Sequence, residues 1–536
     1  MMMNMPGDRS LAETVLRRSL DVAPGMVVIL CCSASLFLSI LESRINFDVH
    51  HWGLMYVNAA DLNHGLVPYR EIFIQYGFLT TLLQSVAIAI FGDSVVSVGI
   101  ITGIFYSISI FLSYLLLAKI IGKWLSALAA AVMFLVHGYS IYPWSNYFAY
   151  TLLLVALSFL LLPSPKGRWY LLAGIFCALS FLARQTAVSV LPPVYLFFGI
   201  LCWKATGNSR KLHLRNICIF HAGMLGVLGS FLLFLCIENA FADWVRQSFS
   251  IANVYSTASG GVRYWIKTFL RGVFLAEGWH YRDARLKLYS LVFLNAFVMW
   301  VIVVRRLLRE KGKGEDLALL LLSTTVLCGY LQAFHIYEIF RLQNGSSLGI
   351  GLLFFSMYFL ARKLAPFQHA VFGIPVVILI TKLSMNFLFV STSSVYNPWD
   401  RHLLFSGQLR EPRDIAMLRG KLYDKDRCEY YESLAAILKG YRSRLPYIVN
   451  LSSNSYVPLL VPSLKRVQRI PFYCGPGMDE IVPHEREDVD KLLAAEKAIC
   501  VSAKPDQVPD NYRIIFEKKD PEIYVSVPQL LADAKP

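Results

Sequence analysis

Long apolar runs separated by short polar segments dominate the first 390 positions of the chain. A lipid-spanning helix needs about 20 predominantly apolar residues, and runs of this kind recur throughout the region. We therefore predict eleven membrane-spanning helices, near residues 24–41, 95–117, 124–140, 148–163, 169–185, 190–203, 216–236, 288–304, 316–333, 347–361 and 369–391.

One further apolar run, Gly77 to Phe91, is predicted to lie on the membrane surface. It ends at Gly92-Asp93 and carries the polar residues Thr80, Thr81 and Gln84. At about 15 residues it is short for a span, which favours an interfacial or re-entrant helix. Counting it as a span would also reverse the side on which every later loop lies.

The pattern changes after residue 391. Strand-like apolar runs, such as residues 447–449 and 512–516, alternate with helical stretches such as 429–439 and 488–497. This alternation is typical of a small α/β domain. We therefore predict two domains: an α-helical multi-pass membrane domain over residues 1–391 and a C-terminal α/β domain over residues 392–536. Cys428, Cys474 and Cys500 lie in the second domain, so one disulfide is allowed there, with the pairing open.

Composition and charge agree with a membrane protein. Of the 536 residues, 56% are hydrophobic and 16% are charged, and the mean hydropathy is +0.50. The net charge of +15 does not indicate nucleic-acid binding, because residues 392–536 carry 21 Lys/Arg and 20 Asp/Glu. The membrane domain holds the other 30 basic and 16 acidic residues, and most of this excess lies in short loops between apolar runs.

The positions of these basic loops predict the topology. Loops rich in Lys and Arg stay on the cytoplasmic side. All basic loops can be cytoplasmic if the N-terminus is cytoplasmic and Gly77 to Phe91 does not cross. Eleven spans then place the C-terminal domain on the opposite side, which is the periplasm if the membrane is a bacterial inner membrane.

The loop after the first span carries the densest candidate chemistry. It contains Asp48, His50, His51, Tyr69 and Glu71, close to the predicted external membrane surface. Asp48 follows the first helix by a few residues, so its carboxylate is placed to accept a proton from a hydroxyl of a second substrate. The alternative is a helix-cap aspartate, the usual role of an Asp at such a position.

This loop resembles the first external loop of the GT-C superfamily of membrane glycosyltransferases, which includes protein O-mannosyltransferases and lipid A aminoarabinose transferases. The resemblance rests on Asp48, on the segment Gly65-x-x-Pro68-Tyr69-Arg70-Glu71, and on the apolar run ending in Phe91-Gly92. It implies two juxtamembrane helices in this loop. It also implies inverting transfer of a sugar from a polyprenyl-phosphate donor to a lipid, glycan or protein acceptor, with Asp48 as base and Glu71 as second acid.

The sequence departs from this family in the next external segment. Many members have a second acid there, whereas residues 137–147 contain none. Asn146 or His137 can bind a sugar hydroxyl, and His50, His51 and Tyr69 are further substrate-binding candidates. Trp144 and the neighbouring tyrosines have the simpler alternative of anchoring the chain at the membrane interface.

External basic residues are the candidate ligands of a lipid phosphate. Arg263, Lys267 and Arg271 are spaced four apart and share one face if helical. Their alternatives are a long loop that escapes the charge rule, or contact with anionic lipid headgroups. Arg184 and Arg341 lie at predicted outer helix ends, where a charge is costly unless it is paired or functional. Arg341 also has Glu338 as a nearby ion-pair candidate.

No cofactor is expected. Some members of the superfamily bind a divalent cation, but Asp48, His50 and Asp61 are scattered along one loop and make a weak metal-site pattern. Three alternatives to a polyprenyl-phosphate-dependent glycosyltransferase stay open at this stage: an O-antigen ligase or polymerase, a transporter of lipid-linked glycans, and a non-catalytic assembly subunit.

Overall fold

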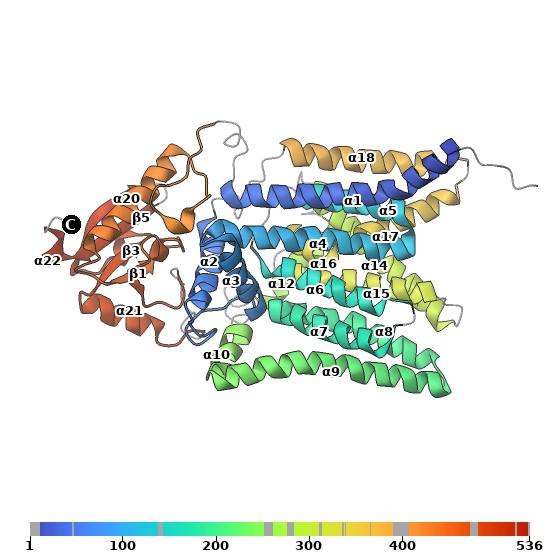
Figure 1. The fold of residues 1–536 in the computed structure, drawn as a ribbon, viewed down its shortest axis with the longest axis horizontal. Helices are drawn as coiled ribbons and strands as arrows, with labels where there is room; N and C mark the ends of the chain where they lie inside the picture. The colour runs from blue at the N-terminus through green and yellow to red at the C-terminus, as the bar shows by residue number, and fades with distance from the viewer. Residues whose placement is uncertain are drawn as a thin grey trace, which may run out of the picture.

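The computed structural model describes residues 11–45, 48–137, 143–163, 165–250, 261–275, 284–309, 314–334, 337, 339–364, 366–389, 407–471, 481–519 and 522–533. A bundle of helices running side by side forms one part of the molecule, and a smaller domain with a β-sheet covers one end of it (Figure 1).

Every predicted span has a helix in its place. These helices are α1 (Leu11–Ile45), α4 (Val95–Ile121), α5 (Lys123–His137), α6 (Ser145–Leu160), α7 (Gly167–Ala183), α8 (Leu191–Lys204), α9 (Gly207–Ile237), α14 (Ala284–Leu308), α15 (Gly314–Gly329), α17 (Leu348–Arg362) and α18 (Gln368–Phe389). In the described residues, seven helical segments are long and apolar enough to cross a membrane, and five shorter apolar helices accompany them. The predicted multi-pass helical fold is confirmed.

The first long loop contains two helices, α2 (Val49–Asn63) and α3 (Phe78–Phe91). Both lie at the end of the bundle that faces the C-terminal domain (Figure 1). The polar residues of α3 hold it there: Thr80 donates to the carbonyl of Ala183 at 2.8 Å, and Gln84 donates to that of Pro143 at 2.9 Å. The run predicted to lie on the surface is therefore a short helix across the bundle end.

The C-terminal domain has a five-stranded sheet in the order β2-β1-β3-β5-β4. Strands β2 (Lys465–Arg466), β1 (Tyr447–Leu451) and β3 (Ala498–Ser502) are parallel, and β5 (Glu522–Pro528) pairs antiparallel with β3 and with β4 (Tyr512–Lys519). The main helices are α20 (Lys425–Tyr441) and α21 (Glu485–Ala494). This confirms the predicted α/β domain, whose predicted boundary at 391/392 lies outside the described residues. Cys428 and Cys500 are buried free thiols, and Cys474 lies outside the described residues.

Two contacts dock this domain onto the bundle. In the first, residues 420–422 bind the end of α1: the backbone N–H of Leu422 donates to the carbonyl of Arg44 at 2.7 Å, and the Lys421 ammonium donates to the carbonyl of Ser43 at 3.0 Å. Arg44 returns a bond from its Nε to the carbonyl of Gly420 at 3.0 Å. The domain is thus tied to the bundle by backbone groups as well as side chains.

The second contact is with α2. Ser455 donates to the carbonyl of His50 at 3.0 Å, and Arg466 forms an ion pair with Asp61. Gly53 lets the domain come this close, because a Cβ at this position would lie 2.5 Å from the Cβ of Ser455. The helix that begins beside Asp48 is therefore held between the bundle and the C-terminal domain.

Candidate active site

Asp48 caps the N-terminus of α2 and also binds a histidine. Its Oδ1 accepts the backbone N–H groups of His50 and His51 at 2.9 and 3.1 Å, as an N-cap aspartate does. Its Oδ2 lies 2.7 Å from Nδ1 of His51. The side chain is only 9% exposed. The cap role is therefore real, but it occupies one carboxylate oxygen and leaves the other facing the histidine ring.

The surroundings keep Asp48 ionised. Burial by itself would raise the pKa of this carboxyl, but the hydrogen bonds and charge of His51, together with the charge of His50, bring the pKa below its usual value. Burial, followed by the charge of His51, lowers the pKa of His50 to about 4, so His50 is neutral at pH 7. Asp48 is therefore present as a carboxylate that can accept a proton.

An aromatic wall continues from His51. The rings of His51 and Trp144 have centroids 4.9 Å apart, and those of Trp144 and Tyr76 are 4.6 Å apart. Trp144 stands directly before α6, and Tyr76 stands two residues before α3. The segments that precede three helices thus meet at the end of the bundle.

Two buried arginines lie against this wall. Arg341, on α16 (Ile339–Ser346), has its Cζ 5.6 Å from the ring centre of Trp144 and is 7% exposed. Arg184, directly after α7, has its Cζ 5.5 Å from the ring centre of Tyr76 and is 6% exposed. Burial, and then the positive charge of Arg341, lowers the pKa of Arg184 to about 9, so the two guanidinium groups are close enough to repel each other.

Arg184 is held by hydroxyls. Its Nε donates to Thr186 at 2.7 Å, and one terminal nitrogen donates to Ser145 at 2.8 Å. Among the described carboxylates, none lies within ion-pair distance of this guanidinium. We call the set Asp48, His51, Tyr76, Trp144, Arg184 and Arg341 the Asp48 cluster. It combines one carboxylate with two cations on a shared aromatic wall.

Three predicted residues of the first loop lie next to this cluster or outside it. The ring of His50 packs against that of His51 at 4.7 Å. Tyr69 is buried with a positive φ of 67°, and its carbonyl accepts a bond from Gln247 at 2.7 Å, so it shapes the loop. Glu71 is 41% exposed, accepts the N–H of Val67 at 2.7 Å and contacts Arg70 at 3.4 Å. The geometry gives no support to Glu71 as the second acid.

The remaining predicted residues divide in the same way. Asn146 is buried next to Ser145 and donates to Gln332 at 2.9 Å. Arg263 and Lys267 on α12 (Gly261–Leu270) and the following Arg271 are all exposed, so this basic row is not part of the buried cluster. Glu338 and the side chain of His137 lie outside the described residues. Among the residues the structure describes, no group of three or more His, Cys, Asp or Glu is placed to hold a metal ion.

Lys421 is a site residue that the sequence did not reveal. It is fully buried, and besides its bond to Ser43 its ammonium lies 5.3 Å from the ring centre of Trp52. Burial lowers its pKa to about 7, and the negative charge of Asp48 acts in the opposite direction. A lysine in a polar stretch gives no sequence signal of this kind. Its proximity to Asp48 arises only when the C-terminal domain docks.

Comparison with known proteins gives the class of this fold. A family model described as dolichyl-phosphate-mannose-protein mannosyltransferase matches residues 76–244. The matched stretch includes Tyr76, Trp144 and Arg184, and leaves Asp48 and Arg341 outside. No match was found among curated protein sequences.

Two solved structures of ArnT from Cupriavidus metallidurans are similar over almost the whole chain. The apo structure has a TM-score of 0.55 at 12% identity, covering 94% of this chain and 98% of that chain. The structure bound to undecaprenyl phosphate has a TM-score of 0.51 at 12% identity, covering 93% and 97%. At this identity the likeness establishes the fold. The chain has the fold of GT-C glycosyltransferases, and the resemblance predicted from the first loop is confirmed.

Proposed function

We propose that this chain is an inverting glycosyltransferase that moves a sugar from a polyprenyl-phosphate donor to a lipid, glycan or protein acceptor. The reaction takes place at the external face of a bacterial inner membrane. The N-terminus is cytoplasmic and the C-terminal domain is periplasmic, as the basic loops predict. The GT-C fold supports the general class, and the Asp48 cluster supports the chemistry.

The observation that carries this proposal is the burial of Arg184 and Arg341 beside each other, against the same aromatic wall as His51 and Asp48. Burying two like charges is unfavourable unless an opposite charge offsets them. A phosphate between the two guanidinium groups provides that charge through bidentate, charge-assisted hydrogen bonds. The ArnT structure bound to undecaprenyl phosphate shows that a protein of this fold takes such a lipid.

In the proposed reaction, the acceptor hydroxyl attacks the anomeric carbon of the donor sugar from the face opposite the phosphate. The new bond joins the acceptor oxygen to that carbon, and the bond from the carbon to the phosphate oxygen breaks. Asp48 takes the hydroxyl proton as general base. Arg184 and Arg341 stabilise the negative charge that develops on the departing lipid phosphate. Displacement from the opposite face inverts the anomeric configuration.

The test uses membranes containing the protein and a panel of polyprenyl-phosphate sugars. Asp48→Asn keeps the oxygen that caps α2, because Asn is an equally good N-cap residue, but it removes the base. We expect transfer to fall by about 100-fold or more, the usual contribution of a general base, while binding of the lipid phosphate persists.

Glu71→Gln is the matched control, an acid of the same loop changed to its amide, and we expect near-normal transfer. Full activity in Asp48→Asn would contradict the assignment of the base. Transfer only from pyrophosphate-linked donors would replace the proposed reaction with that of an O-antigen ligase or polymerase.

A further inference from the structure

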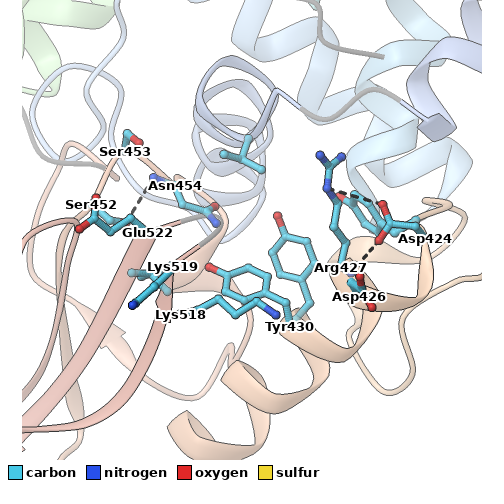
Figure 2. Close-up of a pocket in the computed structure, with 14 residues that line it drawn as sticks. Asp424, Asp426, Arg427, Tyr430, Ser452, Ser453, Asn454, Lys518, Lys519 and Glu522 are labelled. Atoms are coloured by element: carbon cyan, nitrogen blue, oxygen red, sulfur yellow. Dashed lines mark hydrogen bonds and ion pairs between the residues drawn. The ribbon is translucent and has the colours of Figure 1, made fainter. Parts of the chain in front are cut away.

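A cavity of about 670 Å³ lies in the C-terminal domain beside the N-terminus of α2 (Figure 2). Asp424, Asp426, Arg427 and Tyr430 come from the start of α20, and Ser452 to Asn454 line the opposite side. Lys518, Lys519 and Glu522 reach it from β4 and β5, and Val49 is contributed by α2. Its volume is within the range of about 300–1,000 Å³ typical of small-molecule sites.

The charges around this cavity are balanced. Three acidic side chains (Asp424, Asp426 and Glu522) face three basic ones (Arg427, Lys518 and Lys519). Arg427 is already bound to Asp424, with its Nε 3.8 Å from the carboxylate. A polyanion, such as a phosphorylated group, would meet as much repulsion as attraction here. The lining therefore favours a ligand that is polar but carries no net charge.

The lining also alternates aromatic rings with small polar groups. Tyr423, Tyr430 and Tyr431 are buried in the wall, and Ser452, Ser453 and Asn454 offer hydroxyl, amide and backbone groups. A tyrosine presents an apolar ring face and a polar tip. A sugar ring is its counterpart, with apolar C–H faces and hydroxyls around the edge. The balanced charge and the tyrosines together match a carbohydrate.

The position of the cavity links it to the Asp48 cluster. Val49 in its wall is the residue next to Asp48, and the loop carrying Ser452 to Asn454 continues to Ser455, which binds the carbonyl of His50. Tyr431 in the wall packs on Tyr456 with centroids 6.2 Å apart. Tyr456 is in turn close enough to Asp48 for the two to interact electrostatically. The cavity is thus adjacent to the proposed base, on the side of the C-terminal domain.

We propose that this cavity is an acceptor subsite that binds a neutral or zwitterionic carbohydrate unit of the acceptor. Assigning the bound glycan as the acceptor rests on the proposed glycosyltransferase function; the existence of a carbohydrate site does not. The acceptor class is thereby narrowed to molecules that already carry sugar, with the cavity holding one unit while a hydroxyl nearby reaches Asp48.

Two variants address the cavity directly. Ser453→Trp places a large side chain at an exposed position of the lining and fills the cavity from its rim. Its control is Ser463→Trp, also exposed and on the same domain but outside the lining. Tyr430→Phe removes one hydroxyl and keeps the ring. Its control is Tyr441→Phe, a buried tyrosine of the same helix that does not line the cavity.

The experiment probes an array of neutral, amino-sugar and acidic oligosaccharides with the full-length protein in lipid nanodiscs. Hits are then titrated as free oligosaccharides. We expect wild type to bind neutral or zwitterionic glycans. Ser453→Trp should weaken binding by 10-fold or more, and Tyr430→Phe by about 5-fold, which is the loss of one hydrogen bond. Both control variants and Asp48→Asn should bind as wild type does.

The other outcomes overturn the proposal. Binding of no glycan, binding of acidic glycans only, or binding that is unchanged in Ser453→Trp each exclude a carbohydrate site of this kind. Failure of the proposed function gives a different result: Asp48→Asn retains transfer, while glycan binding still responds to Ser453→Trp. The two hypotheses are therefore separable within one set of variants.

Discussion

The molecule has two groups of basic residues that the sequence placed on the same side of the membrane, and they differ in environment. Arg184 and Arg341 are buried against aromatic rings at the end of the bundle, within electrostatic reach of each other. Arg263, Lys267 and Arg271 are exposed on α12 and the turn that follows it. Both groups were candidate phosphate ligands.

The difference between them decides which group is a binding site. An exposed cation is solvated and screened, so its interaction with a phosphate is weak. A buried cation has lost its water and gains far more from an anion that replaces it. The spacing of charges along a helix identifies a common face, whereas burial identifies where a charge awaits a partner. The predictions below test this difference.

Replacing the buried arginines should have the largest effect. Arg341→Gln and Arg184→Gln each remove charge from the proposed phosphate site, and a contact stabilising a transition-state charge is worth about 100-fold or more. We expect kcat/KM for a polyprenyl-phosphate sugar to fall by about 100-fold in each variant, with weaker binding of the lipid phosphate. Wild-type affinity for polyprenyl phosphate in both variants would move the phosphate site elsewhere.

The buried region also depends on the docked C-terminal domain, which Gly53→Ala tests. The added Cβ would lie 2.5 Å from Ser455 and 3.0 Å from the ring of Tyr456, so the domain must shift. We expect a cost of about 1–3 kcal/mol, seen as a melting temperature lowered by several degrees, together with reduced transfer. In Gly229→Ala, the control on α9, the Cβ meets nothing within 4 Å, so stability should be unchanged or slightly higher.

Lys421 is a third buried cation, and its effect should depend on pH. Burial lowers its pKa to about 7 from an ordinary 10.5. Between these values the unfolded chain binds one more proton than the folded chain, so stability should rise with pH over this window. Lys421→Met should show a flatter rise in melting temperature from pH 7 to about 9.5. Lys491→Met changes an exposed lysine, and its pH profile should match wild type.

The exposed basic row should have the smallest effect. We expect Arg263→Gln, Lys267→Gln and Arg271→Gln, separately or together, to change kcat/KM by no more than about threefold, in line with the weak interactions of exposed charges. The measurement is the same transfer assay at low and at physiological salt. A loss as large as that of Arg341→Gln would show that burial is a poor guide to the phosphate site.

Much of the fold followed from the sequence because lipid imposes simple rules. A spanning helix must be long and apolar, so the apolar runs gave the helices of the bundle, and Thr80 and Gln84 marked the run that became the short helix α3. Alternation of apolar residues gave β1 and β4 in the C-terminal domain. Asp48, Arg184 and Arg341 were also identifiable, because charges near helix ends at a membrane surface need an explanation.

The sequence did not determine which of these charges meet. Trp144 read equally well as an interfacial anchor, Glu71 looked like a partner of Asp48, and Lys421 gave no signal. Tertiary packing decided these cases: it buried Trp144 between His51 and Arg341, left Glu71 bound to its own loop, and brought Lys421 from the C-terminal domain to α1. The sequence alone determined where the helices lie and which charges are expensive. Only the tertiary structure determined which charges lose their water together, because burial depends on segments hundreds of residues apart.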